Sequence, residues 1–318
     1  MEKIFITGLD GFVGIHMAQY YIKKGHHVSG TVWSFNDRED IKKLKNKATI
    51  EKINILDSDS FSKFFKKENP DKVVHLAAQS AIPPSWEDPH GTMQINIGGT
   101  YNLFSAVLEH KKDCIPILIV GAAAEYGHVN SDGSLISEET LFHPDNPYAV
   151  SKIAEEMVAY QYYLSHGLNT FRVRPFTHTG PGQDSRFVCS EFSLTIAKME
   201  KGLMPPEMKI GNLEIIRDFL DVRDVINAYD LILERGKKGE VYNVCSGRGV
   251  SIRQILEILK QHSKIDFKVK VDQSKIRKNE AMAIVGDNKK IKNEIGWKQN
   301  YSFSDTLLSM LEYWRMRV

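Results

Sequence analysis

The sequence predicts an α/β protein in which a doubly wound parallel sheet precedes a smaller C-terminal α/β region. The chain has 318 residues, and about 150 residues per domain fits one large and one smaller domain. Over residues 3–175, short β-rich apolar runs alternate with longer amphipathic stretches, which is typical of βαβ units. After Arg174-Pro175 this alternation gives way to Gly/Pro-rich stretches. We therefore divide the chain into residues 1–175, to which some later segments return, and residues 176–318.

The predicted elements follow the hydrophobic pattern along the chain. Strands are assigned to short apolar β-branched runs, and helices to longer stretches with apolar residues at helical spacing. The strands are residues 4–7, 27–31, 49–53, 72–76, 115–120, 170–173 and 267–271, and the helices are residues 14–24, 60–67, 92–109, 149–166, 222–234 and 251–261.

Composition and charge narrow the class of function. The formal net charge is +2, which gives no overall field for binding nucleic acid or an anionic membrane. No apolar run is long enough to span a bilayer, and no secretory signal pattern precedes the first strand. The three cysteines lie far apart without a CxxC pair, so we expect core thiols in a cytoplasmic protein. The histidines have no metal-ligand spacing, so no metal is predicted.

A glycine-rich turn follows the first predicted strand. Glycines at this spacing allow a tight turn, a close approach of the backbone to a pyrophosphate, and packing of the next helix on the strand. A tight βα turn without a ligand is the alternative, but the complete strand–turn–helix–strand context favours dinucleotide binding. The predicted cofactor-binding residues here are Gly8, Gly11, Phe12, Val13 and Gly14.

The end of the second strand bears on the choice of cofactor. An acidic residue there binds the adenosine ribose 2′-OH of NAD, whereas a basic one accommodates the 2′-phosphate of NADP. Thr31-Val32-Trp33-Ser34 has no carboxylate, and Asp37 and Arg38 follow in a loop. NADP(H) is slightly favoured over NAD(H). Asn54 and Ile55, after the third strand, are placed for the adenine, with ordinary loop polarity as the alternative.

Tyr148 and Lys152 are four residues apart, hence on one face of a predicted helix. A nearby ammonium favours the phenolate and lowers the pKa of a tyrosine, as proton transfer at a carbonyl or carbinol oxygen requires. Such a pair also occurs by chance in helices. The pair follows the fifth strand of a predicted dinucleotide-binding fold, and this position favours a catalytic role.

These motifs together resemble the extended short-chain dehydrogenase/reductase family of nucleotide-sugar enzymes, over essentially the whole chain. Within it, the later motifs are most similar to the branch of GDP-6-deoxy-4-keto-D-mannose reductases and GDP-mannose 4,6-dehydratases. The resemblance rests on the glycine turn, His75-Leu76-Ala77-Ala78-Gln79, Asn96, Tyr148 with Lys152, Arg174-Pro175-Phe176, 178–183, 187–190, 211–219 and 240–247.

The resemblance implies a Rossmann-like fold and roles for individual residues. Tyr148 is expected to act as general acid/base, and Lys152 as its electrostatic and ribose-binding partner. The other residues implied are Leu76, Ala77 and Ala78 for the cofactor, and Thr177, Phe187, Val188, Arg217, Arg277 and Glu280 for the nucleotide sugar, each with a solvated surface group or simple packing as the alternative.

The chain departs from the family at the end of the fifth strand. Ala122 stands where the family has a Ser or Thr hydroxyl, and Ala124 stands where a dehydratase has an acidic residue. Thr177 or His178 is a possible substitute donor, whereas Glu125 should point to the opposite side if the strand persists. Dehydration needs that acidic residue, but reduction needs only a hydride and a proton.

We therefore predict NAD(P)H-dependent reduction at C4 of a GDP-linked 4-keto-6-deoxyhexose, or of a heptose relative. The alternatives are a GDP-sugar dehydratase or epimerase of the same fold, and a cofactor-binding protein with impaired catalysis. The long predicted helices 92–109 and 149–166 have faces that could form the seam of a homodimer.

Overall fold

The computed structural model describes residues 1–34, 39–128, 134–276 and 281–318. A seven-stranded sheet forms its centre, with every neighbouring pair of strands parallel. The strand order is β10-β6-β5-β4-β1-β2-β3, which is the order of a doubly wound sheet extended by one strand. The strands are β1 (Lys3–Thr7), β2 (His27–Val32), β3 (Thr49–Lys52), β4 (Lys72–His75), β5 (Ile117–Val120), β6 (Thr170–Pro175) and β10 (Val241–Val244).

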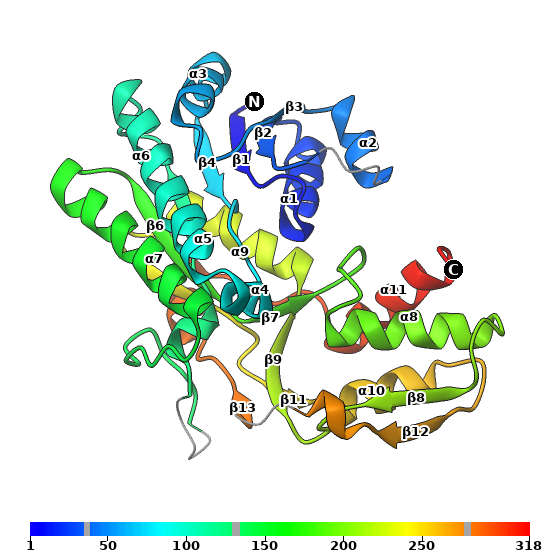
Figure 1. Ribbon diagram of the computed structural model, residues 1–318. Helices are drawn as coiled ribbons and strands as arrows, with labels where there is room; N and C mark the ends of the chain where they lie inside the picture. Colours follow the sequence, from blue (N-terminus) through cyan, green and yellow to red (C-terminus); the bar gives the residue numbers. More distant parts are fainter. Residues whose placement is uncertain (35–38, 129–133, 277–280) are drawn as a thin grey trace.

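Helices cover both faces of this sheet (Figure 1). One face packs against α1 (Phe12–Lys23), α2 (Glu39–Lys45) and α9 (Val222–Arg235). The other packs against α3 (Ser58–Glu68), α6 (Gly99–Glu109) and α7 (Pro147–His166). Strands β1 and β4 are neighbours although β2 and β3 lie between them in the chain, so the winding reverses at this point. Ligands of such sheets bind at the carboxyl ends of the strands beside the reversal.

The smaller region has its own apolar core beside the large sheet (Figure 1). Its helices are α8 (Val188–Glu200), α10 (Ile252–Gln261) and α11 (Phe303–Arg315), which pack over the two-stranded sheet of β8 (Glu207–Ile210) and β12 (Lys268–Val271). A further small sheet is formed by β7 (Thr177–Thr179), β9 (Ile216–Asp221), β11 (Gly249–Ser251) and β13 (Ala283–Ile284). The remaining short elements are α4 (Ile82–Glu87), α5 (Pro89–Met93), η1 (Gln94–Gly98), η2 (Ala123–Tyr126), η3 (Gln273–Lys275) and η4 (Ile291–Ile295).

The predicted fold class is confirmed, and each predicted strand overlaps an observed one. The helix predicted over 92–109 is different, because the π-helical segment η1 separates α5 from α6. The helix predicted from Ser251 begins at Ile252, since the Ser251 hydroxyl caps it by accepting the Gln254 amide at 3.1 Å. Strands β7, β8, β9, β10, β11 and β13 were not predicted. Each pairs with a segment distant in the sequence, and this pairing rather than a long hydrophobic run defines it.

The cysteines are only partly as expected. Cys189 and Cys245 are buried thiols, but Cys114 is exposed, so the prediction of a core thiol there is wrong. Cys114 lies in the turn between α6 and β5, where a short connection crosses the protein surface.

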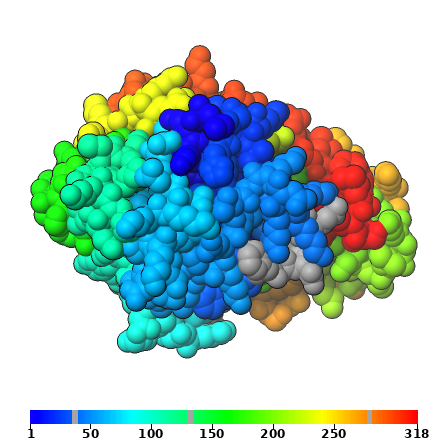
Figure 2. Space-filling view, turned by 90° about the horizontal axis from the view of Figure 1, so that it is seen from above, coloured from blue at the N-terminus to red at the C-terminus, as the bar shows by residue number. Residues whose placement is uncertain are grey.

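The space-filling view separates the two flanks of the molecule. In Figure 2, α6 and α7 (teal to green) form the left flank, and α8 and α11 (lime and red) form the right flank. The outer face of α6 and α7 is therefore distant from the smaller region. The assignment of residues 1–175 and 176–318 to separate domains stays a prediction.

Candidate active site

The glycine turn lies at the carboxyl end of β1. Gly8 has φ +67°, and a Cβ atom there would stand 2.8 Å from the Ala77 amide nitrogen. A Cβ atom on Gly14 would stand 2.5 Å from the Gly8 carbonyl oxygen. Gly11 caps α1 without a side-chain hydrogen bond, so the first amides of the helix are not used by a cap. The turn thus packs closely against the backbone that leaves β4, and the first amides of α1 are available to bind an anion.

Phe12 and Val13 begin α1 and are half-buried. The Phe12 ring is 6.3 Å from the parallel His178 ring of β7, centroid to centroid. The first turn of α1 therefore contacts the strand that leads into the smaller region.

Thr7 ties the ends of β1 and β4 together. Its hydroxyl oxygen accepts the amides of Leu76 and Ala77, both at 3.1 Å, and so donates its proton to His75 Nδ1 at 2.8 Å. The His75 Nε2 proton is then directed to the Thr100 hydroxyl at 3.1 Å. Burial lowers the pKa of His75 to about 3, with the charge of Lys152 acting in the same direction. His75 is therefore neutral and joins β1 to α6 through its two ring nitrogens.

Leu76, Ala77 and Ala78, predicted to contact the cofactor, lie on the loop that leaves β4 beside Gly8. Sequence analysis did not assign a role to Thr7. Its position as the last residue of a strand directly before the glycine turn is the signal that could have found it.

A hollow of about 320 Å³ lies at the ends of β2 and β3, lined by Trp33, Ser34, Lys52 and Asn54. Asn54, predicted to contact the adenine, lines this hollow. The side chain of Ile55 is buried against Gly99 and the apolar core, so only its backbone is available to a ligand. Asp37 and Arg38 lie outside the described residues.

Tyr148 lies in the first turn of α7, where the Asn146 side chain caps the helix by accepting the Ala149 amide at 2.9 Å. The Ser151 hydroxyl donates to the Tyr148 carbonyl at 2.7 Å and accepts from Asn96 Nδ2 at 2.8 Å. Asn96 also binds the Gln79 backbone, accepting from its amide at 2.7 Å and donating to its carbonyl at 3.1 Å. The π-helical segment η1 thereby connects the loop after β4 to the first turn of α7.

The electrostatics of Tyr148 differ from the expectation. Burial raises the pKa of Tyr148, and the carboxyl groups of Glu155 and Glu125 raise it further. The Lys152 ammonium is directed to Glu155, with which it forms a buried ion pair. The predicted lowering of the Tyr148 pKa by Lys152 is therefore wrong for this arrangement, because the lysine is paired with the carboxylate one turn further along the helix.

The chain after β5, which contains Ala122 and Ala124, does not continue as an extended strand. The strand ends at Val120, and residues 123–126 form the 3-10 turn η2. Glu125 consequently points into the interior, where its Oε1 accepts the Ala122 amide at 2.6 Å. Burial raises the pKa of Glu125 well above its usual range, and the neighbouring Glu156 carboxylate contributes. Glu125 therefore fixes residues 122–124 from the interior side of the segment.

Arg174 and Glu156 form a buried pair behind Glu125. Arg174 Nη2 and Nε donate to the two oxygens of Glu156 at 2.7 and 2.8 Å, and Arg172 Nη1 adds a bond at 3.0 Å. Burial alone would raise the pKa of Glu156, but these guanidinium groups outweigh it and lower the pKa. This cluster fixes α7 to β6.

The residues predicted to bind the nucleotide sugar lie on several different elements. Phe187 is 47% exposed and caps α8, which begins at Val188 as expected. Arg217 of β9 donates from Nη1 to the carbonyls of Ile216 and Ala281, both at 2.8 Å, which holds its guanidinium at the start of the segment that contains β13. Arg277 and Glu280 lie outside the described residues.

The two possible substitute donors are on β7. Thr177 is exposed at its start. His178 has its Nδ1 hydrogen-bonded to the Phe176 carbonyl at 3.0 Å, and burial lowers its pKa, so the ring is neutral and Nε2 carries a lone pair. Of the two, only Thr177 can donate through an unpaired side-chain proton in this arrangement.

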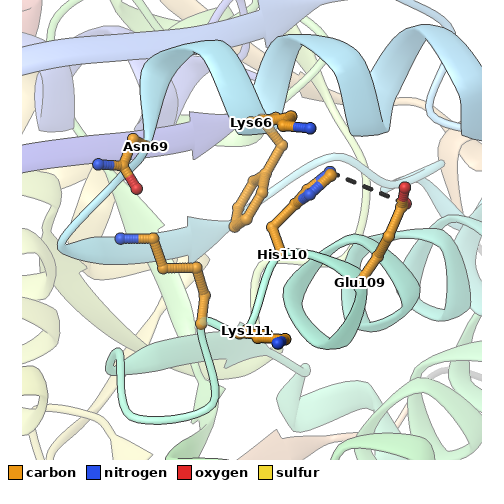
Figure 3. Close-up of a pocket in the computed structure, with 7 residues that line it drawn as sticks. Lys66, Asn69, Glu109, His110 and Lys111 are labelled. Carbon is orange, nitrogen blue, oxygen red and sulfur yellow. Dashed lines mark ion pairs between the residues drawn. The ribbon is translucent and has the colours of Figure 1, made fainter.

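A second hollow, of about 360 Å³, lies at the opposite edge of the sheet (Figure 3). It is formed by the carboxyl ends of α3 and α6, which lead into the amino ends of β4 and β5. His110 and Glu109 form an ion pair there at 3.8 Å. The hollow is therefore remote from the glycine turn and from Tyr148.

The part of the chain that the structure describes contains neither a candidate metal site nor a candidate membrane-spanning helix. No group of three or more His, Cys, Asp or Glu side chains converges there as metal ligands would. Within the same residues, no helix has the length and apolar character needed to cross a bilayer.

Comparison with known proteins places this site in a family. The sequence profile of the family described as GDP-mannose 4,6 dehydratase matches residues 5–310. The chain belongs to this family. It is thus one of the extended short-chain dehydrogenases/reductases, and the resemblance noted from the sequence is confirmed.

The relatives catalyse more than one reaction. The chain is 35% identical to GDP-6-deoxy-D-mannose reductase of Pseudomonas aeruginosa, covering 100% of this chain and 98% of that one. It is 27% identical to GDP-mannose 4,6 dehydratase 2 of Arabidopsis thaliana, covering 96% and 85%. The structure of RMD from Pseudomonas aeruginosa complexed with NADPH superposes with a TM-score of 0.88 at 33% identity, covering 100% of both chains. Membership of the family alone does not choose between reduction and dehydration.

The residues present fit a nicotinamide dinucleotide. Gly8 and Gly14 leave no room for a side chain at the reversal point, and the uncapped first turn of α1 offers amides for a pyrophosphate. The hollow beside Trp33 and Asn54 lies at the end of β2, the strand end at which this fold binds the adenosine ribose. Lys152 and Tyr148 would hold the nicotinamide end.

Proposed function

We propose that this protein reduces the C4 keto group of a GDP-linked 4-keto-6-deoxyhexose, or of a heptose relative, using NADPH or NADH with NADPH favoured. The observation that carries the proposal is the pair of groups at the end of β5. Ala124 has no proton to give or take, and the Glu125 carboxyl is fully buried and bound to the Ala122 amide. A base for the C5 proton, which dehydration requires, is missing from this position.

Reduction needs less from the chain. A reduced nicotinamide supplies the hydride when it is bound. Tyr148 supplies the proton to the developing alkoxide, and its raised pKa suits the protonated acid that reduction consumes. The likeness to a GDP-6-deoxy-D-mannose reductase over the full chain supports the same reaction, and the NADPH in the related structure supports NADPH as cofactor.

The proposed sugar-nucleotide contacts are Thr177, Phe187, Val188 and Arg217, together with Arg277 and Glu280. Arg217 is the strongest of the described residues, because two carbonyls hold its guanidinium at the start of the segment that contains β13, and a guanidinium charge attracts a pyrophosphate. The amides at the start of α8 are a second source of donors.

We further propose a homodimer that works in the cytoplasm. Aromatic and aliphatic side chains at least one-third exposed lie on α6 and α7, namely Tyr101, Val150, Met157, Tyr160 and Leu164. Exposed apolar residues concentrated on two adjacent helices are typical of an interface. Unpaired buried thiols at Cys189 and Cys245 suit a reducing compartment.

The test is to incubate the purified protein with GDP-4-keto-6-deoxymannose and either NADPH or NADH, following the absorbance of the reduced cofactor and identifying the sugar product. We expect a GDP-6-deoxyhexose and consumption of one cofactor per product. Formation of a 4-keto-6-deoxy sugar from GDP-mannose would instead establish a dehydratase. Binding of both ligands without turnover would contradict the proposal, and Ala122→Ser would then show whether the missing hydroxyl is the reason.

A further inference from the structure

Two neighbouring carboxylates on α7, both almost fully buried, have different partners. Glu156 accepts three hydrogen bonds from the guanidinium groups of Arg172 and Arg174. Glu155 binds only the ammonium of Lys152, three residues earlier on the helix. Glu156 therefore belongs to the packing of α7 on β6, whereas Glu155 contacts the residue expected to hold the cofactor.

Glu155 depends on Lys152 for its charge. Its Oε2 accepts from the lysine, while its Oε1 is buried without a hydrogen-bond partner. His75 Nε2 lies 3.9 Å from this Oε1, but its proton is directed to the Thr100 hydroxyl. A buried carboxylate that loses its only cation must regain a proton, because an unpaired charge in the interior is costly.

Lys152 has a second use in the proposed reaction. A lysine one turn after the tyrosine on the same helix face is placed for the ribose of the nicotinamide. The ammonium has three N–H donors, and each one that turns to a ribose hydroxyl is no longer available to the Glu155 carboxylate. The carboxylate and the cofactor therefore compete for one side chain.

We infer that Glu155 is a positioning residue that shares the Lys152 ammonium with the cofactor ribose and takes up a proton from solvent when the lysine turns to the ribose. This inference rests on the proposed cofactor binding. The ion-pair contact between Lys152 and Glu155 breaks, an O–H bond forms on Glu155, and Lys152 keeps its charge. Nothing is oxidised or reduced in this exchange.

The charged and titratable groups around Glu155 come from several elements, and burial raises the pKa of Glu125 as well as that of Glu155. Within the described residues, Lys152, Tyr148 and Glu156 face it from α7, His75 faces it from β4, and Glu125 approaches Tyr148 from η2. Burial outweighs the charge of Lys152 and raises the pKa of Glu155 to about 7. His75 stays neutral because its pKa is about 3, and the arginines keep Glu156 ionised.

The exchange predicts a definite dependence on pH. At pH 8 Glu155 is about nine-tenths ionised, given its pKa of about 7, so binding should take up nearly one proton per chain. At pH 5 Glu155 is already protonated, and uptake should vanish. Cofactor affinity should consequently fall by up to about tenfold per pH unit above 7.

The experiment is a calorimetric titration of the full-length protein with NADPH at pH 5 and pH 8, in two buffers with different heats of ionisation. The difference in heat between buffers gives the number of protons taken up. The test variant is Glu155→Gln, which has the same shape and cannot take up the proton. The matched control is Glu312→Gln, which removes the carboxylate of an exposed ion pair at the same helical spacing, with Arg315.

We expect uptake approaching one proton at pH 8 in the wild type and in Glu312→Gln, and no uptake in Glu155→Gln. NADPH binding without uptake in the wild type would overturn the inference while leaving the proposed function intact, even if Glu155→Gln failed to fold. Unchanged uptake in Glu155→Gln would also overturn it, because another group would then be the acceptor. Failure of the wild type to bind either NADPH or NADH would instead contradict the proposed function, and the inference with it.

Discussion

The residues around the predicted site differ in burial between the edge of the seven-stranded sheet and the smaller region. At the sheet edge, Thr7, Asn96 and Ser151 are fully buried, and each is hydrogen-bonded to at least two partners. In the smaller region, the predicted sugar-nucleotide residues Thr177 and Phe187 are exposed, although polar groups away from them are buried and bonded. Buried, fully bonded groups fix geometry to a fraction of an ångström. The difference suggests that the sheet edge positions the reacting groups, while the smaller region selects the nucleotide sugar.

The sharpest way to break this comparison is to remove the proton donor. We expect Tyr148→Phe to lower kcat by about 10²–10⁴-fold, which is the contribution of a positioned general acid. NADPH affinity should change little, because the network from Asn96 and Ser151 reaches the Tyr148 carbonyl rather than its hydroxyl. Steady-state turnover and NADPH titration measure the two quantities. Equal losses of affinity and turnover would show that the hydroxyl contributes to binding instead.

The buried carboxylate at Glu155 gives a prediction for stability. Its pKa is about 7 in the folded protein against a usual 4.5, so the folded state binds more protons between these values, and its contribution to stability falls as pH rises from about 4.5 to about 7. Over this window the wild type should lose up to about 3 kcal/mol relative to Glu155→Gln. Denaturant unfolding of both proteins at pH 4.5 and pH 8 measures the difference. Parallel pH profiles would mean that folding does not shift the pKa of Glu155.

The steric role of Gly8 can be tested by comparison with Gly25, which has a similar positive φ but open space around it. Gly8 and Gly25 both have positive φ, but a Cβ atom meets the Ala77 backbone only at Gly8. We expect Gly25→Ala to cost about 1 kcal/mol from backbone strain alone. Gly8→Ala should cost about 1–3 kcal/mol more and should abolish NADPH binding. Thermal unfolding and cofactor titration distinguish the two, and equal effects would exclude a steric role for the Gly8 site.

The smallest effect is expected in the region that selects the substrate. Arg217→Gln should raise KM for the nucleotide sugar by about tenfold while leaving kcat nearly unchanged, because a phosphate contact made equally in ground and transition states affects binding only. The control is Arg253→Gln, since Arg253 is an exposed partner of Glu214 on the same side of the molecule. A fall in kcat for Arg217→Gln would show that this region also positions the reacting sugar.

Local sequence patterns determined much of the sheet half. The glycine spacing, the alternation of apolar runs and the four-residue interval between Tyr148 and Lys152 each report on a few consecutive residues, and the backbone follows them. The same patterns could not locate β7, β9 and β13, because these short strands exist only through pairing between distant segments.

The partners of individual side chains were decided by the tertiary structure. Glu125 would point to the opposite side only if the strand continued to it, but β5 ends at Val120, and the carboxyl turns inward to the Ala122 amide. Sequence also predicted that Lys152 would lower the Tyr148 pKa, but the folded helix brings Glu155 to the lysine and buries it there. Burial and the charges of neighbouring segments set the pKa of a side chain, and the amino-acid sequence alone specifies neither of them.

The sequence by itself thus determined the class of fold and the position of the glycine turn, and it predicted Tyr148 and Lys152 as the proton-transfer pair. These follow from local spacing, because backbone geometry repeats every few residues. Only the tertiary structure decided that Thr7 joins β1 to β4, that Asn96 reaches Ser151, and that Glu155 holds Lys152. Such contacts join residues from separate elements or depend on what buries them, and packing of the whole chain determines both.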